Sequence, residues 1–148
     1  MSTKAQHVQP LALNRTVING IIGGVIGGIV FGMLMAMMGM LPMVGMLIGQ
    51  DSAVVGFVVH MAISAAFGAA YGFAAPRLPL RSWVSAAVAG IGYGIILWVA
   101  GALILMPLML GMNEMILQIG QMQLNSLMGH VIFGVVLAAI YKTLLERG

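Results

Sequence analysis

Two histidines are the residues of this chain most able to do chemistry. His60 and His130 each lie inside a long stretch that carries no Asp, Glu, Lys or Arg. An ionisable side chain in such an apolar stretch is costly to bury and therefore marks a candidate functional site. An imidazole there can ligate a metal, or it can stay neutral and hydrogen-bond to a neighbouring helix. We consider both uses, with Ser64 or a backbone carbonyl as the partner in the second.

Methionine is the next unusual feature, with 15 residues in the chain. Thioether sulfur and imidazole nitrogen are soft ligands that suit Cu(I). The pattern therefore allows a copper site made from His60, His130, Met43 and Met109. Methionine is also an adaptable apolar filler, and this second interpretation stays open. Many of the methionines fall in the segments that connect the predicted helices or in the adjoining turns, namely Met40, Met43, Met46, Met106, Met109, Met112, Met115, Met122 and Met128.

The composition shows which solvent surrounds these residues. The chain is 61% hydrophobic and only 6% charged, whereas a soluble domain carries about a quarter charged residues. So few charges cannot cover a protein of 148 residues in water, and we expect a lipid bilayer as its partner. The absence of cysteine excludes disulfides and thiolate sites. A net charge of +3 is too small for a nucleic-acid partner.

Four uncharged stretches divide the chain, and each exceeds the ~20 residues that cross a bilayer. The fold class predicted is an all-α integral membrane protein with four transmembrane helices. We expect a tail at 1–15, a basic turn at 77–81 and a polar connection at 111–123 that can hold a short interfacial helix. The predicted helices run at about 16–41, 53–75, 82–108 and 124–145.

The basic residues predict the orientation. All six fall on one side of the predicted helices, and the two opposite loops carry only Asp51 and Glu114. Lys and Arg concentrate in cytoplasmic loops, so we expect both termini in the cytoplasm and the protein in the inner membrane. The first apolar stretch is too long for the core of a cleaved signal peptide. The six are Lys4, Arg15, Arg77, Arg81, Lys142 and Arg147.

The second half of the chain resembles the first. His60 and Tyr71 recur as His130 and Tyr141 at a common offset of 70. We therefore expect two parallel two-helix repeats, at 16–76 and 82–148, related by a pseudo-twofold axis along the membrane normal. Histidines on the second and fourth helices would then approach the bundle axis from opposite sides at one depth.

Small residues recur at helical spacing on all four predicted helices. In lipid, helices associate by close backbone approach over such residues, so these positions predict helix packing within a bundle or a homo-oligomer. A pore that needs close backbone approach is the alternative. The predicted packing residues are Gly20, Gly24, Gly28, Gly32, Ser64, Gly68, Gly90, Gly94 and Gly134.

In outline the chain resembles the cytochrome b cores of respiratory and photosynthetic complexes. There, diagonal helices of a four-helix bundle supply axial histidines and the other helices carry glycines. The resemblance implies haem b as a cofactor, held by His60 and His130. It covers the arrangement alone, and it departs from the pattern because each predicted ligand helix carries one histidine instead of two.

No motif of a hydrolase, a zinc protease or a P-loop nucleotide-binding protein is present, and we do not expect an enzyme. The leading hypothesis is an accessory or helix-packing subunit of a membrane complex, or a homo-oligomer, whose partners are other membrane helices or itself. The alternative is a haem b or Cu(I) protein for electron transfer or metal handling. A small transporter or channel is a further alternative, because duplicated halves are typical of transporters.

Overall fold

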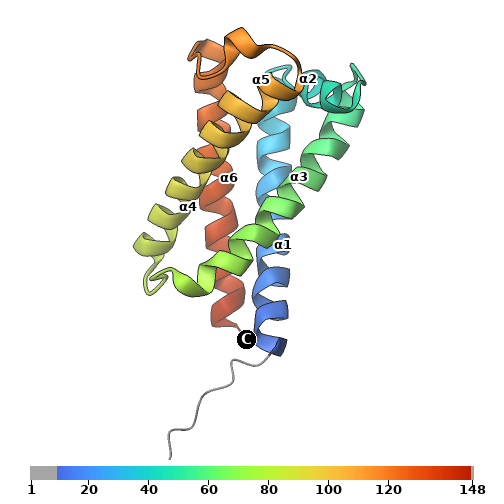
Figure 1. The fold of residues 1–148 in the computed structure, drawn as a ribbon. Coiled ribbons are helices and arrows are strands. Elements are labelled where there is room, and N and C mark those ends of the chain that lie inside the picture. Colours follow the sequence, from blue (N-terminus) through green and yellow to red (C-terminus); the bar gives the residue numbers. More distant parts are fainter. Residues whose placement is uncertain (1–9, 148) are drawn as a thin grey trace, which may run out of the picture.

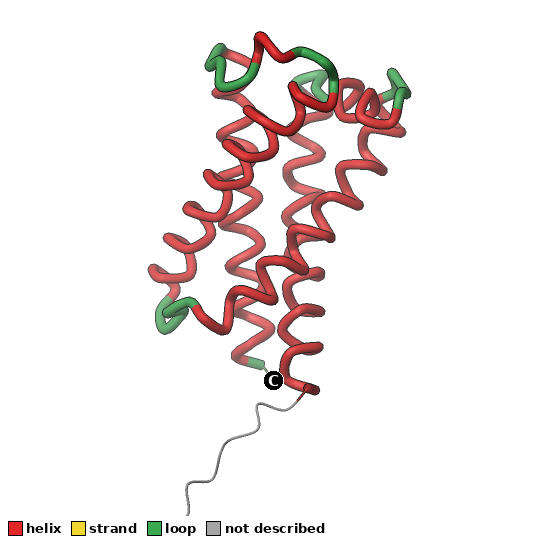
Figure 2. The backbone as a smooth tube through the Cα atoms, in the orientation of Figure 1, coloured by secondary structure: helices red, strands yellow, loops and turns green. Residues whose placement is uncertain are grey.

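The computed structural model describes residues 10–147, which form helices and short connections without a strand (Figures 1 and 2). Four stretches are long and apolar enough to span a membrane: Leu13–Met37, Ala53–Arg77, Trp83–Met109 and Gln121–Glu146. The prediction of an all-helical chain with four such helices is therefore confirmed. The elements are α1 (Pro10–Met37), α2 (Leu41–Gly45), η1 (Met46–Ile48), α3 (Ala53–Ala74), η2 (Ala75–Arg77), α4 (Trp83–Leu97), η3 (Trp98–Leu105), α5 (Met106–Met109), η4 (Asn113–Met115) and α6 (Gln121–Glu146).

The first helix differs from the predicted span at both ends. It begins at Pro10, inside the segment expected as a tail, and it ends at Met37 instead of near 41. Gly39 has a positive φ of 67° and donates its N–H to the Ala36 carbonyl, while Met40 donates to Met35. These two bonds form a Schellman end, which glycine favours because it has no Cβ. The rest of the predicted tail, including Lys4, lies outside the described residues.

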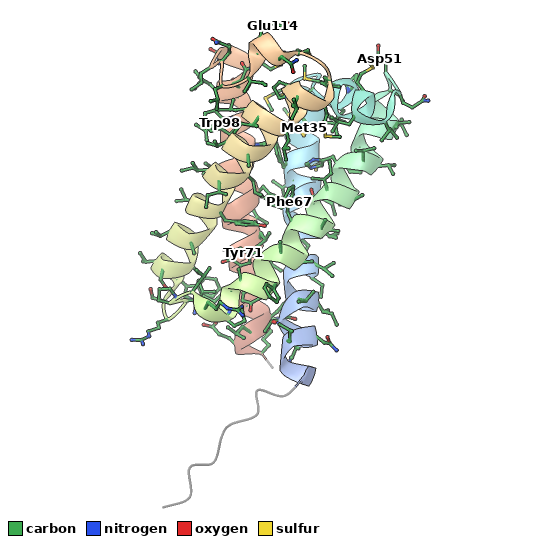
Figure 3. The ribbon with its side chains drawn as sticks, viewed as in Figure 1. Met35, Asp51, Phe67, Tyr71, Trp98 and Glu114 are labelled. Atoms are coloured by element: carbon green, nitrogen blue, oxygen red, sulfur yellow. The ribbon has the colours of Figure 1, made fainter. Side chains whose placement is uncertain are left out.

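The helices form two layers, with α1 and α6 behind α3 and α4 (Figure 1). The most extensive packing joins α1 to α3, α4 to α6 and α1 to α6, so α3 and α6 are diagonal. The start of α1, the turn between α3 and α4, and the end of α6 share one end, which we call the basic end. Asp51 and Glu114 lie at the opposite end, which we call the acidic end (Figure 3).

Glycines bring the paired helices into backbone contact in the basic half. A Cβ on Gly24 would collide with the Ser64 carbonyl and lie 2.7 Å from the Gly68 Cα. Gly20 meets α3 one turn further on, at Gly68 and 2.7 Å from the Gly72 Cα. In the second pair, Gly90 lies against the Gly134 carbonyl and Gly94 against the His130 carbonyl. No larger side chain fits at these contacts without separating the helices.

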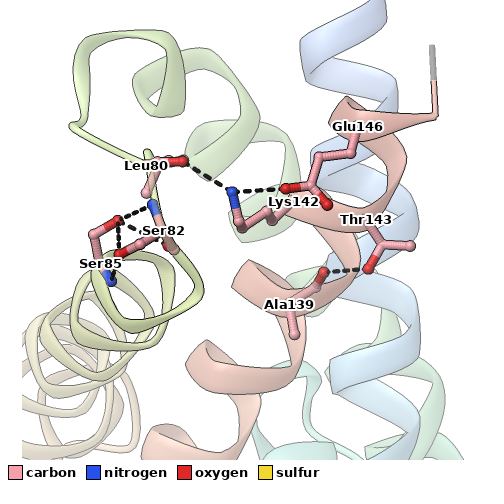
Figure 4. A network of polar contacts seen from close by, with 7 residues as sticks. All are labelled: Leu80, Ser82, Ser85, Ala139, Lys142, Thr143 and Glu146. Carbon is pink, nitrogen blue, oxygen red and sulfur yellow. Dashed lines mark hydrogen bonds and ion pairs between the residues drawn. The ribbon is translucent and has the colours of Figure 1, made fainter.

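Lys142, near the end of α6, bonds to the basic turn at 77–81 (Figure 4). Its Nζ donates to the Leu80 carbonyl at 3.1 Å, pairs with Glu146 at 2.9 Å and lies 5.6 Å from the centre of the Trp83 ring. The residue is only 4% exposed. Lys142 is therefore a structural cation as well as one of the basic residues of this end.

Candidate functional site

The four residues predicted for a metal site line one cavity of about 420 Å³ in the acidic half of the bundle. His60 comes from α3, His130 from α6, Met43 from α2 and Met109 from α5. Helix α1 adds Phe31 and Met35 to the wall. Residues far apart in the sequence thus meet around one space. The other lining residues are Met40, Val44, Leu47, Ile48, Val59, Ile63, Ser64, Phe67, Leu97, Gly101, Ala102, Leu105, Met106, Ser126 and Phe133.

One wall of the cavity is the π-helical segment η3. Pro107 has no N–H for the carbonyl of Leu103, four residues earlier, and its ring crowds that carbonyl. The Leu103 carbonyl instead accepts the N–H of Leu117 at 3.0 Å, and Leu117 adopts a positive φ of 59°. Gly101 lies in this widened segment, and a Cβ there would meet no atom within 4 Å. Such π segments occur frequently at functional sites.

A tyrosine cluster closes the bundle on the basic side of the cavity. Tyr71 packs edge-on against Tyr93 and Tyr141, with ring centres 5.2 and 5.5 Å apart. The Tyr93 hydroxyl donates to the Phe67 carbonyl at 2.7 Å and so joins α4 to α3. Figure 3 shows Phe67 and Tyr71 below Met35, toward the basic end. The cavity is therefore confined to one half of the span.

The outer part of the cavity lining is exposed and apolar. Ile48, Leu105 and Met109 are 60%, 48% and 63% exposed. An opening with such walls offers no charged or hydrogen-bonding side chain, and the thioether of Met109 is the one potential metal ligand among these three. A molecule that passes it must be able to leave water, and lipid is the medium that wets such a surface.

His60 is buried and has a defined tautomer. Its Nε2 lies 3.0 Å from the Gly28 carbonyl and 3.4 Å from Ser64 Oγ. A carbonyl oxygen accepts hydrogen bonds and cannot donate them, so Nε2 carries the proton and Nδ1 keeps its lone pair. Gly32 makes room for this ring, because a Cβ there would lie 3.2 Å from His60 Cδ2 and 2.7 Å from Phe57.

His130 has the opposite tautomer. Its Nδ1 lies 2.8 Å from the Ser126 carbonyl and 3.3 Å from Ser126 Oγ, one turn earlier on the same helix. By the same reasoning Nδ1 carries the proton, and Nε2 keeps the lone pair. The ring is half-buried at the cavity wall. Each histidine therefore gives its single N–H to a carbonyl and retains one acceptor nitrogen.

Phe31 packs against both histidine rings. Its ring centre lies 5.2 Å from that of His60 and 4.9 Å from that of His130, edge-on to both. The sequence analysis overlooked Phe31, although it is the only aromatic residue between Pro10 and Met37. Phe31 is therefore a shared neighbour of the two residues predicted as haem ligands.

The donor set suits a soft metal ion better than a hard one. Among the residues that the structure describes, no group of three or more His, Asp or Glu could hold a metal. Imidazole and thioether are the available ligand types in the cavity, and these favour Cu(I). Asp51 and Glu114 lie in connections at the acidic end and are exposed there.

The comparisons with known proteins add no assignment to this geometry. No protein-family model, no curated protein and no solved structure matches the chain. The site is therefore interpreted from its residues and their contacts.

Proposed function

We propose that this chain is a non-enzymatic inner-membrane protein that binds a small apolar molecule in the cavity between His60 and His130. The cavity carries this proposal. A half-open pocket of about 420 Å³ adjoins two imidazoles, each of which keeps one nitrogen free of hydrogen bonds to the protein. Apolar pockets of roughly 300–1,000 Å³ with a few convergent polar groups are typical of ligand sites. The exposed apolar lining at Ile48, Leu105 and Met109 favours entry from the bilayer.

The intramolecular glycine contacts argue for binding over assembly. The accessory-subunit and homo-oligomer hypotheses assign the function to contacts with other membrane helices, and the small residues were predicted to pack helices within a bundle or a homo-oligomer. In the structure Gly24 and Gly68 pack α1 on α3, and Gly90 and Gly134 pack α4 on α6. These contacts need no partner, so the cavity is the feature left for a function to explain. The tyrosine cluster below it makes a binding site a better account than a channel.

Both termini are proposed to lie in the cytoplasm, with the cavity in the outer half of the membrane. The support is the positive-inside bias of the sequence, together with the grouping of Arg15, Arg77, Arg81, Lys142 and Arg147 at one end. Reporters inserted after Pro79 and after Gly148 should report the cytoplasm, and those at Asp51 and Gly120 the outside. A cytoplasmic signal at Gly120 would contradict this orientation.

The proposed duplication rests on the equivalent sequence positions of His60 and His130, and each ring binds a backbone carbonyl. The partners differ, since Gly28 lies on a neighbouring helix and Ser126 on the same one. The two copies would therefore have diverged in how they hold the ring.

Binding is tested with naphthalene as the probe and two matched glycine variants of one long helix. Gly101 lines the cavity, whereas Gly92 is exposed outside it, and a Cβ at either position meets open space. Equilibrium dialysis of the detergent-solubilised protein should show saturable binding by the parent and by Gly92→Leu. Gly101→Leu should weaken it about tenfold or more, because its side chain enters the cavity. Unsaturable uptake equal to that of empty micelles would overturn the proposal.

A Cu(I) site is the second candidate, favoured by the meeting of Met43 and Met109 with both histidines. Titration with Ag(I), which has the same soft-ligand preference, tests it. The expected result for this candidate is one tightly bound ion per chain, lost in Met43→Leu, Met109→Leu and His130→Phe. Absence of stoichiometric Ag(I) binding by the parent would exclude it.

A further inference from the structure

We infer that the molecule bound in the cavity is an alcohol or a phenol, held through its hydroxyl by the free nitrogen of His130 or His60. This inference rests on the proposed function and adds the chemical class of the ligand. It follows from the hydrogen bonds that the two rings already make and from the polar groups that remain.

Both ring N–H groups are committed to the protein. His60 Nε2 donates to Gly28 and His130 Nδ1 donates to Ser126, at 3.0 and 2.8 Å. The nitrogens that remain, His60 Nδ1 and His130 Nε2, are pure acceptors as long as the rings are neutral. A ligand that meets them must therefore bring a donor.

Both histidines line the cavity. Among the described side chains, Tyr71 Oη is the one fully enclosed nitrogen or oxygen atom that lacks a hydrogen-bond partner, so neither free ring nitrogen belongs to that class. The inference places these two nitrogens toward the cavity that their residues line.

The rest of the cavity lining contains few other polar groups that a ligand hydroxyl could bond. Apart from the histidines, its polar side chains are Ser64 and Ser126. Both hydroxyls lie beside a histidine ring nitrogen, at 3.4 and 3.3 Å, and both residues are buried. Every other lining side chain is apolar. The site is therefore an apolar space with two unpaired acceptor nitrogens and two serine hydroxyls beside the protonated ring nitrogens.

This arrangement discriminates between oxygen functions of similar size. A hydroxyl can donate a hydrogen bond to the lone pair of the ring nitrogen. An ether, ketone, quinone or ester oxygen has no proton to donate, so two lone pairs would face each other. A site that hydrogen-bonds a hydroxyl rejects the analogue without it, because its own polar group is then left unpaired. As whole residues, His130 has intermediate exposure and His60 is 7% exposed.

The test compares 2-naphthol with 2-methoxynaphthalene in the same detergent, each corrected for its uptake by empty micelles. The parent and Gly92→Leu should bind 2-naphthol about tenfold more tightly than the methyl ether. In His130→Phe the preference should fall to a few-fold, and in the double variant with His60→Phe it should vanish. The methyl ether should bind the histidine variants at least as tightly as the parent, because the phenyl rings keep the space apolar and leave no ring nitrogen unpaired.

The outcomes separate this inference from the proposed function. Equal binding of the two probes by the parent overturns the hydroxyl inference and leaves the apolar binding site intact. Binding of neither probe overturns both. A preference that survives in a folded double variant assigns the hydroxyl to another group and also overturns the inference.

A second measurement does not depend on any variant folding. Nitrogen-15 NMR of histidine-labelled protein should show His60 with its proton on Nε2 and His130 with its proton on Nδ1. Addition of 2-naphthol should shift the unprotonated nitrogen of His130 and leave its protonated one nearly unchanged. A proton found on His130 Nε2 in the free protein would overturn the inference.

Discussion

The two halves of this bundle use the same residue types for opposite purposes. In the basic half, glycines let backbones touch, as Gly24 does against Ser64 and Gly90 against Gly134. In the acidic half, Gly32 makes room for the rings of Phe57 and His60, and Gly101 faces open space. The basic half contains Tyr71, packed against two other tyrosines. The acidic half contains a cavity of about 420 Å³.

The difference shows how a small membrane protein can hold an open site. Without a hydrophobic driving force between helices in lipid, stability comes from close packing and hydrogen bonds. Here glycine contacts join α1 to α3 and α4 to α6, and at the acidic end Gly56 packs α3 against the Leu41 carbonyl of α2. The acidic half nevertheless contains the cavity. The unfilled space there is the part that a ligand can occupy.

The largest expected effect is the response of the two halves to one substitution. Gly24→Leu should destabilise the fold by about 3 kcal/mol or more, because its side chain meets the α3 backbone. Gly101→Leu should be neutral or stabilising, since it enters open space and leucine favours the helix by up to about 1 kcal/mol. Melting in detergent, followed by fluorescence-detected gel filtration, measures both. Similar losses at both positions would remove the contrast between the halves.

Lys142 provides the next largest effect, at the basic end. Lys142→Met should cost about 2 kcal/mol, because the Leu80 carbonyl loses a charged donor and the turn is released. Glu146→Gln is the matched control and should cost about 0.5 kcal/mol or less, since the Glu146 side chain is 51% exposed. Equal losses in thermal stability would mean that the ion pair matters and the carbonyl contact does not.

The tyrosine cluster allows a sharper pair of variants. Tyr93→Phe should destabilise by about 1 kcal/mol, because it removes the hydrogen bond to the Phe67 carbonyl. Tyr71→Phe should be neutral or slightly stabilising, since the Tyr71 hydroxyl is buried without a partner. The melting temperatures of the two single variants in detergent measure this difference. A loss at Tyr71 as large as that at Tyr93 would indicate that the Tyr71 hydroxyl is bonded after all.

The smallest effect concerns Pro107 and should be local. Pro107→Ala restores an N–H that can bond the Leu103 carbonyl within the helix. This donor competes with Leu117, so amide exchange at Leu117 should accelerate several-fold while exchange in the core of α1 stays unchanged. Unchanged protection of Leu117 would mean that the proline is not the cause of this contact.

Some predictions from the sequence depended on pattern alone and could be made well. Uncharged length predicted the four apolar helices that the structure shows. Helix ends were less predictable, because the Schellman end at Gly39 competes with the apolar pattern that continues to Leu41. The cavity wall could not be predicted from the sequence. It includes a π segment in which the carbonyl of Leu103, which Pro107 cannot bond, accepts the N–H of Leu117.

The sequence by itself determined that this chain has four apolar helices and which few residues on them could do chemistry. Hydrophobic length and charge spacing are local properties, and they survive without knowledge of any contact. Only the tertiary structure decided that His60, His130, Met43 and Met109 line one cavity, that Phe31 packs against both rings, and which nitrogen of each ring is free. Those features depend on the register between helices, and register is fixed by packing across the bundle.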